Sequence, residues 1–241
     1  MNLSIVIPAF EESRKIARDV TQAAKFLDAH RIEGEIIVVD DGSEDNTAET
    51  AKSVEISPSV ERDVLRYEAH RGKGYAVRMG MMRSRGEYVM FVDSGCCVPY
   101  EDTLRGLELL KSGTCDIAHG SRKTCGCHIR QGQSLYRRIC SAIFHWFVIR
   151  QIKIPVELSD TQCGFKVYKG DVARHLYSES VIDGFTFDIE IIMRAQKEGY
   201  RIKEFPINWT CDRDSRLSPT RSFWRVLTEL WIIRRRMPKK S

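Results

Sequence analysis

The chain has 241 residues, of which 42% are hydrophobic and 29% are charged, which predicts one compact domain with at most a short appendage. No apolar stretch reaches the roughly 20 residues that a helix needs to cross a bilayer, so the composition excludes a membrane-spanning segment. The net charge is +5, and the basic excess lies in two stretches without acidic residues, Ile117–Val156 and Leu230–Ser241, which indicates an anionic partner.

The first residues and the cysteines indicate the cellular compartment. Residues 1–8 have neither the basic region nor the long apolar run of a signal peptide. We therefore expect a cytoplasmic protein whose eight cysteines are reduced. Cys125, Cys127 and His128 lack the paired spacing of a structural zinc site, which disfavours that interpretation.

The first half of the chain alternates between two kinds of pattern. Short apolar runs predict strands at residues 3–7, 35–39, 64–67 and 88–92, and helical patterns fill the intervals at 11–29, 45–54 and 73–84. Buried strands separated by helices indicate βαβ units around a mostly parallel sheet that is covered on both faces. The predicted fold class is therefore α/β.

Polar residues follow three of these strands, in the segments Pro8–Glu12, Asp40–Ser43 and Asp93–Gly95. Ligands of open α/β sheets bind beyond the carboxyl ends of the strands, so these segments would present carboxylates to one crevice. Ordinary turn chemistry is the alternative for each segment alone, because Asp-Gly-Ser forms turns and Asp45 or Asn46 can cap a helix. Their joint appearance at equivalent positions favours a ligand site.

The segment Arg71–Gly74 precedes the third predicted helix. Free N–H groups at the start of a helix, together with Lys73, suit a phosphate group. The segment lacks the spacing of a P-loop, which disfavours an ATPase, and a flexible basic loop is the alternative.

The second half contains two amphipathic patterns. Apolar residues recur at helical spacing from Leu135 to Phe147 within residues 134–150, and residues 222–237 combine aromatic side chains with a triple arginine. Apolar residues beside a basic cluster are typical of a helix that lies at a membrane interface. Packing on the protein's own sheet and a dimer contact are the alternatives. Nucleic acid is disfavoured because no known binding motif accompanies the charge.

Several motifs are shared with a known family. They are Val6–Glu12, Ile37–Ser43, Gly72–Gly74, Arg85–Tyr88, Gly120–Arg122, Asp160–Lys166, Phe187–Glu190 and Glu204–Trp209. Through them the chain, from about Leu3 to Arg216, resembles family 2 glycosyltransferases of the GT-A fold. Within that family it resembles the dolichyl-phosphate glucosyltransferase and dolichyl-phosphate mannose synthase group.

The resemblance implies a domain organisation. Residues 1–216 would form the GT-A catalytic domain, a Rossmann-like, mostly parallel sheet flanked by helices. Its nucleotide-binding half would cover about 1–120 and its acceptor half about 121–216. Residues 217–241 would form a basic amphipathic C-terminal helix.

The resemblance also implies an activity. The enzyme would move a hexose, with inversion, from a nucleotide sugar to a polyprenyl or dolichyl phosphate at the cytoplasmic face of a membrane. UDP-glucose is favoured over GDP-mannose as the donor. The expected partners are the nucleotide sugar, the polyprenyl phosphate and an anionic membrane surface, and a separate membrane-anchoring subunit is left open. No nucleic acid is expected.

Roles for individual residues follow from the same resemblance. Nucleotide-sugar binding falls to Pro8, Ala9, Phe10, Glu12, Asp40, Asp41, Lys73, Ser94 and Gly95. Acceptor binding falls to Ser121, Arg122, Arg130, Arg138 and Ser141. The sugar end would be lined by Asp160, Gln162, Asp188 and Glu190. The expected catalytic residues are Asp93, Arg122, Arg138 and Asp188, of which Asp93 would also hold Mg²⁺ or Mn²⁺.

One position departs from the family pattern. The family usually has Asp-x-Asp after the fourth strand, whereas Asp93–Gly95 supplies a single carboxylate. Mg²⁺ can keep several waters while it bridges to substrate phosphates, so one carboxylate can suffice at weaker affinity. The sequence leaves the metal requirement open.

Two other functions fit the same residues. A transferase that acts on a non-lipid hydroxyl acceptor would need a carboxylate base such as Asp160 or Asp188. A homologue that binds nucleotide sugar without turnover is compatible with Gly95 at the second acidic position. A lipid-phosphate acceptor needs no such base, because the second pKa of a phosphate is about 6 and the group is already ionised.

Overall fold

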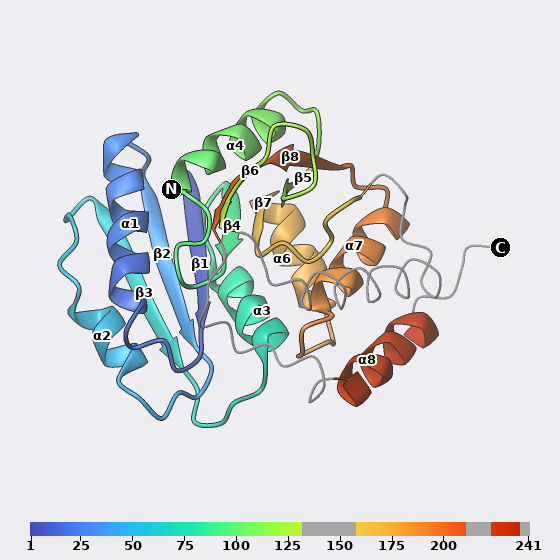
Figure 1. Ribbon diagram of the computed structural model, residues 1–241, viewed down its shortest axis with the longest axis horizontal. Coiled ribbons are helices and arrows are strands. Elements are labelled where there is room, and N and C mark those ends of the chain that lie inside the picture. The colour runs from blue at the N-terminus through green and yellow to red at the C-terminus, as the bar shows by residue number, and fades with distance from the viewer. Residues whose placement is uncertain (132–157, 211–222, 237–241) are drawn as a thin grey trace.

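The structure, a computed structural model, describes residues 1–131, 158–210 and 223–236 (Figure 1). The amphipathic helix expected at 134–150, which includes Arg138 and Ser141, lies outside the described residues.

Strands and helices alternate through the first half of the chain, as predicted. The elements are β1 (Leu3–Ala9), α1 (Ile16–Ala29), β2 (Gly34–Asp40), α2 (Thr47–Ser53), β3 (Val60–Arg66), α3 (Lys73–Arg83) and β4 (Tyr88–Val92). Two boundaries differ from the prediction by more than two residues. Helix α1 begins at Ile16 rather than at residue 11, because the preceding residues form a loop that is bonded to the loop after β2. Strand β3 begins at Val60 rather than at residue 64, because it is an edge strand whose first residues are mostly polar.

The second half adds shorter elements. They are the 3₁₀ turn η1 (Tyr100–Asp102), α4 (Thr103–Lys111), β5 (Ile117–Ser121), β6 (His128–Gln131), β7 (Phe165–Lys169), α6 (Gly170–Ser178), α7 (Phe187–Lys197), β8 (Ile202–Pro206), β9 (Asn208–Thr210) and α8 (Phe223–Arg236).

Within the described residues the main sheet has seven strands in the order β3-β2-β1-β4-β7-β5-β8. Strand β7 runs antiparallel to both of its neighbours, and the other neighbouring pairs are parallel. The expected mostly parallel α/β sheet is therefore confirmed. Strands β6 and β9 form a separate parallel pair.

Helices cover both faces of the sheet (Figure 1). Ile5 and Ile7 of β1 pack into a core with residues of α1 and α4, whereas Val6 points to the opposite face and packs into a core with residues of α3, α6 and α7. This alternation explains why the strand is apolar at nearly every position, since both of its faces are buried.

The strand order places a switch point beside β1. From β1 the chain proceeds through β2 to β3 on one side, and β4 then pairs with β1 on the other side. Because these strands are parallel, the loops after β1, β2 and β4 emerge at the same edge of the sheet. Ligands of open α/β sheets bind at such an edge.

Helix α8 contributes to the core on one side only. Leu230 and Ile233 are buried in the core that α3, α6 and α7 share, while Trp231 is 58% exposed. Part of the apolar pattern therefore packs on the protein itself, as the alternative interpretation held, and part of it faces outward. Arg234, Arg235 and Arg236 are also exposed. Among the described helices, none combines the length and the apolar character that crossing a bilayer requires.

Candidate active site

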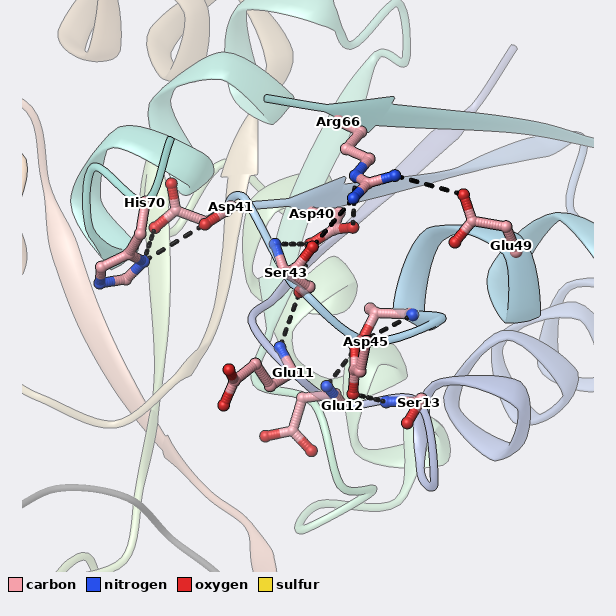
Figure 2. Close-up of polar contacts among 11 residues, drawn as sticks. Glu11, Glu12, Ser13, Asp40, Asp41, Ser43, Asp45, Glu49, Arg66 and His70 are labelled. Atoms are coloured by element: carbon pink, nitrogen blue, oxygen red, sulfur yellow. Dashed lines mark hydrogen bonds and ion pairs between the residues drawn. The ribbon is translucent and has the colours of Figure 1, made fainter. Parts of the chain in front are cut away.

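The turn after β2 is shaped by Asp40, which is fully buried (Figure 2). Its Oδ1 accepts hydrogen bonds from the backbone N–H of Ser43, at 3.0 Å, and from the Ser43 hydroxyl. Arg66 lies 3.8 Å from its other oxygen. The carboxylate of Asp40, which we expected to contact the nucleotide, thus holds this turn.

The loop after β1 is bonded to the loop after β2. Three successive backbone N–H groups donate to side chains of that second loop: Glu11 to Ser43 Oγ at 2.7 Å, Glu12 to Thr47 Oγ1 at 2.8 Å and Ser13 to Asp45 Oδ2 at 3.2 Å. Figure 2 shows the contacts of Glu11 with Ser43 and of Ser13 with Asp45. The two strand ends thus form one preorganised wall, and Pro8 and Ala9 lie buried in β1 behind it.

Asp41 connects this wall to the segment before α3. Its carboxylate accepts hydrogen bonds from the backbone N–H groups of Arg71, at 3.0 Å, and Gly72, at 2.7 Å, and lies 2.9 Å from Nδ1 of His70. Burial raises the pKa of Asp41, and the two N–H groups oppose the rise. The ring of His70 lies 4.0 Å from that of Phe10, centroid to centroid.

Asp41 is buried in this arrangement, whereas His70, which contacts it, is exposed. Sequence reasoning missed His70, although an aromatic ring beside that of Phe10 is a natural neighbour for a nucleobase.

An ion pair lies at the carboxyl end of β4. Lys73, the first residue of α3, places Nζ 2.6 Å from Oδ1 of Asp93. The two side chains are 23% and 40% exposed, respectively, so ligands can reach both. Burial lowers the pKa of Lys73, but the charges of Asp93 and Asp188 more than offset this, so the ammonium stays protonated at neutral pH. Lys73 and Asp93 are thus placed together, as expected.

Gly164 lies directly against the carboxylate of Asp93. The backbone N–H of Asp93 donates to the carbonyl of Gly164 at 2.9 Å, and a Cβ at Gly164 would collide with Asp93 Oδ2. Sequence reasoning did not single out this glycine, although it belongs to the motif Asp160–Lys166.

The Gly164→Ala variant is therefore expected to displace the Asp93 side chain and to lower kcat about 100-fold, since the displaced charge no longer faces the reacting groups. Steady-state kinetics and circular dichroism check this. Gly113→Ala is the control: the φ of +69° at Gly113 makes an alanine there strained and lowers stability, but a Cβ at Gly113 meets nothing within 4 Å, so kcat should stay near normal. Near-normal turnover by the Gly164 variant would contradict this packing.

The turn that follows Asp93 is held by Asp19 of α1. The buried carboxylate of Asp19 accepts from the Ser94 hydroxyl at 2.7 Å, from the Gly95 N–H at 2.9 Å and from the Cys96 thiol at 2.9 Å. Burial, followed by the charge of Asp19, raises the pKa of Cys96 to about 12. The side chain of Ser94, which we expected to contact the nucleotide, is thus bonded to Asp19 and partly buried.

The placement of Asp93 and Asp19 determines which carboxylate at this end of β4 can bind a metal ion. No group of three potential His, Cys, Asp or Glu ligands occurs in the described ranges, and the carboxylate of Asp19 is committed to the turn. Asp93 is partly exposed and can serve as one carboxylate ligand. The residues present thus fit a Mg²⁺ or Mn²⁺ ion that takes its remaining ligands from substrate phosphates and water.

A second lysine–aspartate pair lies beneath the first. Asp188, at the start of α7, is buried and accepts a 2.6 Å hydrogen bond from Lys166 Nζ, which also donates to the Cys163 carbonyl at 2.8 Å. Burial raises the pKa of Asp188, and the ammonium groups of Lys166 and Lys73 oppose the rise. Asp188, which we expected to act on the substrate, thus forms a buried ion pair with Lys166, and its charge favours the protonated form of Lys73. Lys166 was not identified from the sequence.

Glu190, which we expected at the sugar end, lies near the start of α7. Its carboxylate is buried and accepts from the N–H groups of Val181, at 3.0 Å, and Ile182, at 2.9 Å, and from Arg194 at 2.9 Å. It therefore anchors the loop before α7.

The acceptor candidate Arg122 follows β5 and forms a forked ion pair with Asp160. Nε donates at 2.6 Å and Nη2 at 2.7 Å, while Nη1 takes no part in this pair. Burial raises the pKa of Asp160, but the bonds from Arg122 outweigh it and the net shift is downward. The Glu204 carboxylate accepts a hydrogen bond from the Asp160 backbone N–H at 2.7 Å. The Trp209 ring lies 5.3 Å from the Arg122 guanidinium. Glu204 and Trp209 were not assigned from the sequence.

The remaining candidates have mixed placements. Ser121, which we expected to bind the acceptor, is buried, and its hydroxyl lies 3.1 Å from that of Ser159 in a hydrogen bond. Gln162 donates to the Phe185 carbonyl at 3.4 Å. Arg130 lies in β6. Arg138 and Ser141 lie outside the described residues.

The arrangement brings charges of both signs to one edge of the sheet. Burial lowers the pKa of Arg122, but the bonds to Asp160 outweigh this, and the charge of Asp93 adds to the net rise. The Lys73–Asp93 and Arg122–Asp160 pairs are therefore electrostatic neighbours. A site of this kind can hold two anionic groups side by side, one near each cation.

Residues 4–177 match the family model described as glycosyl transferase family 2. Two similar curated proteins are dolichyl-phosphate beta-glucosyltransferases. That of Dictyostelium discoideum is 33% identical over 96% of this chain and 73% of its own length, and that of Homo sapiens is 31% identical over 97% and 75%.

The fold is also shared with solved structures. Glucosyl-3-phosphoglycerate synthase from Mycobacterium tuberculosis, in complex with Mn²⁺, UDP and glucosyl-3-phosphoglycerate, aligns with a TM-score of 0.75 at 18% identity. The alignment covers 99% of this chain and 81% of that one. The GT-A fold expected from the sequence is thereby confirmed.

Proposed function

Because the chain belongs to glycosyltransferase family 2, we propose that it transfers a hexose from a nucleotide sugar to a polyprenyl or dolichyl phosphate. The observation that carries the proposal is the pairing of Lys73 with Asp93 beside Arg122 with Asp160, at the ligand-binding edge of the sheet. Two relatives that span most of the chain are named as glucosyltransferases, which favours UDP-glucose as the donor.

The chemistry requires a phosphate oxygen to attack the anomeric carbon while the nucleoside diphosphate leaves from the opposite face, so that the configuration inverts. The attacking phosphate is largely ionised at neutral pH, since its second pKa is about 6. It needs no general base. The burial of Asp160 and Asp188 in ion pairs agrees with this, because neither is free to take a proton.

Charge builds up on the leaving diphosphate, and Lys73 is the residue placed to compensate it. Lys73 is the first residue of α3, and the N-terminal end of a helix itself favours negative charge. The remaining wall of the donor site would be Phe10, Glu12 and Asp41. A divalent cation held by Asp93 would supply further positive charge at the diphosphate.

The acceptor phosphate would bind at Arg122. The bond to Asp160 fixes the guanidinium plane, and Trp209 limits its movement, so the side chain is preorganised. Arg130, Arg138 and Ser141 are proposed to complete this subsite.

The two functional halves, about 1–120 and 121–216, share one sheet. Strand β7 of the second half pairs with β4 of the first. The division therefore concerns ligands rather than independently folded units.

The outer surface of α8 suits an anionic bilayer. Trp231 is 58% exposed, and Arg235 lies 5.2 Å from its ring. We propose that this surface, together with residues 134–150, holds the site at headgroup depth on the cytoplasmic face, where the acceptor phosphate lies.

Replacing Arg234, Arg235 and Arg236 with Ala is expected to weaken binding to phosphatidylserine vesicles about 100-fold, since each basic residue near an anionic leaflet contributes about 1 kcal/mol. Cosedimentation at several salt concentrations measures this. The charge-matched control is Lys25, Lys52 and Lys111 to Ala, on exposed positions of other helices. Equal binding by the two triple variants would remove α8 from the membrane contact.

Acceptor class is tested by offering radiolabelled UDP-glucose or GDP-mannose with a short polyprenyl phosphate, with the matching polyprenol, or with no acceptor. Label that becomes organic-extractable only with the phosphate supports the proposal and identifies the sugar. Transfer to the polyprenol alone would indicate a hydroxyl acceptor. Nucleotide-sugar binding without any product would indicate a non-catalytic homologue.

A further inference from the structure

The inner face of α8 carries a polar pair that the reaction described so far does not use. Arg225 and Glu229 lie one turn apart, and Arg225 Nε donates to Glu229 Oε1 at 3.0 Å. Glu229 is buried, which is unusual for a carboxylate unless it is fully bonded. Its Oε2 accepts from the Thr186 hydroxyl at 2.6 Å and from the Thr186 backbone N–H at 3.3 Å. The pair therefore binds to the residue just before α7.

The same pair reaches the donor side of the site. Arg225 Nη2 donates to the backbone carbonyl of Arg71 at 3.1 Å. The N–H groups of Arg71 and Gly72 are the ones that bond to Asp41, and Lys73 follows directly. The contact from α8 thus lies two residues along the chain from the ammonium proposed to compensate the diphosphate.

Three segments pack closely at this point because glycines lie between them. Gly72 packs against the Asp183 carbonyl and the Arg225 side chain, Gly74 packs against the carbonyls of Ile182 and Gly184, and Gly184 packs against the Glu229 carboxylate. The Tyr75 N–H also donates to the Asp183 carbonyl at 3.2 Å. The side chains of Arg225 and Glu229 thus connect α8 to the Arg71–Gly74 segment and to the loop before α7.

We propose that Arg225 and Glu229 are positioning residues of the donor site. They fix the segment Arg71–Lys73 so that Lys73 faces Asp93, and so that the Arg71 and Gly72 N–H groups stay on Asp41. This inference rests on the proposed function, because it assumes that these groups hold the nucleoside diphosphate. The outer face of α8, which carries the exposed Trp231, takes no part in these contacts. It remains available for the proposed membrane contact.

The test measures nucleotide binding apart from acceptor binding. Titration calorimetry gives the Kd for UDP and for GDP, and kinetics give the KM for donor and acceptor. Glu229→Ala and Arg225→Ala are expected to weaken nucleotide binding and raise the donor KM about tenfold, the loss of one charge-assisted hydrogen bond. The acceptor KM should stay unchanged, which a general loss of fold would not produce.

Two controls match the substitutions in residue type. Arg83→Ala removes an exposed arginine that pairs with Asp63, and Glu198→Ala removes an exposed glutamate that pairs with His175. Both should bind nucleotide as the wild type does. Where an alanine variant fails to fold, Glu229→Gln and Arg225→Lys replace it. The Gln keeps an oxygen for Thr186 but offers Arg225 no carboxylate, and the Lys has a single ammonium in place of the fork.

The possible outcomes distinguish failure of the positioning role from failure of the proposed function. Folded Arg225 and Glu229 variants that bind UDP and GDP as tightly as the wild type would overturn the positioning role alone. A wild-type protein that binds neither nucleotide would overturn the proposed function itself. Weaker nucleotide binding with a parallel rise in the acceptor KM would also overturn the inference, because it would show an effect on the whole fold.

Discussion

The Asp93→Asn variant is expected to lose about 100-fold or more in kcat while its fold is retained. The amide has the size of the carboxylate, so it fits against Gly164, and the side chain is 40% exposed, so no buried charge is left behind. What is lost is the anion that orients the Lys73 ammonium and is proposed to hold the cation. Turnover is measured with UDP-glucose and polyprenyl phosphate in Mg²⁺, Mn²⁺ and chelator.

The control for Asp93 is Asp63→Asn, which breaks a surface ion pair with Arg83 at 2.8 Å and should leave kcat near normal. The metal is tested in the same series. Mn²⁺ should strengthen UDP binding by the wild type and should have no such effect on the Asp93→Asn variant. An Asp93→Asn enzyme with nearly full activity would contradict the placement of the diphosphate at this pair.

The Arg122→Ala variant is expected to raise the acceptor KM about tenfold to 100-fold, while the donor KM stays close to that of the wild type. Arg122 is held by Asp160 in a fixed orientation, and its forked donors suit phosphate oxygens. Lys73, which is proposed to serve the donor, is left intact. Initial rates with each substrate varied in turn measure the two constants.

Because the Arg122→Ala variant is expected to be less stable, its kinetics are compared with those of a second variant. Removal of Arg122 leaves Asp160 buried without its partner, which costs about 3–5 kcal/mol in comparable cases. The double variant Arg122→Ala with Asp160→Ala removes both charges and should recover much of the thermal stability without recovering acceptor affinity. Equal losses of donor and acceptor affinity in the double variant would mean that Arg122 supports the fold rather than the acceptor.

The sequence predicted the fold because its strands are buried on both faces. The apolar run of β4 was located at its true bounds, 88–92, and α3 was located to within one residue. The errors arise where tertiary contacts replace periodicity. The loop before α1 is polar like a first helical turn, but it is bonded across to Ser43 and Thr47 instead. Strand β3 carries polar residues because it is at the sheet edge.

The candidate site was predicted in outline. The strand ends at Asp41 and Asp93 do meet the segment that contains Lys73, because parallel strands deliver their carboxyl ends to one edge. Which carboxylates face the substrate could not be read from the sequence. Two of the buried carboxylates form ion pairs with residues that are far away in the sequence, Asp188 with Lys166 and Asp160 with Arg122.

Supporting residues were missed for the same reason. Asp19, Gly164 and Glu229 act through contacts with Ser94, Asp93 and Thr186, and these pairs are separated by tens of residues in the chain. A glycine that admits a carboxylate, or a glutamate that caps a loop from another helix, has no local pattern. Such roles become visible only when the packing is known.

The most direct test of the account is the structure of the lipid product, because lipid-phosphate transfer with inversion fixes both the bond and its configuration. The enzyme is incubated with UDP-glucose labelled with ¹³C at the anomeric carbon and a short polyprenyl phosphate, and the extracted lipid is analysed by mass spectrometry and NMR. The account predicts a polyprenyl phosphate that carries one glucose in the β configuration, with phosphorus coupling at the anomeric carbon. An α-linked product, or glucose bonded to anything other than the lipid phosphate, would contradict it.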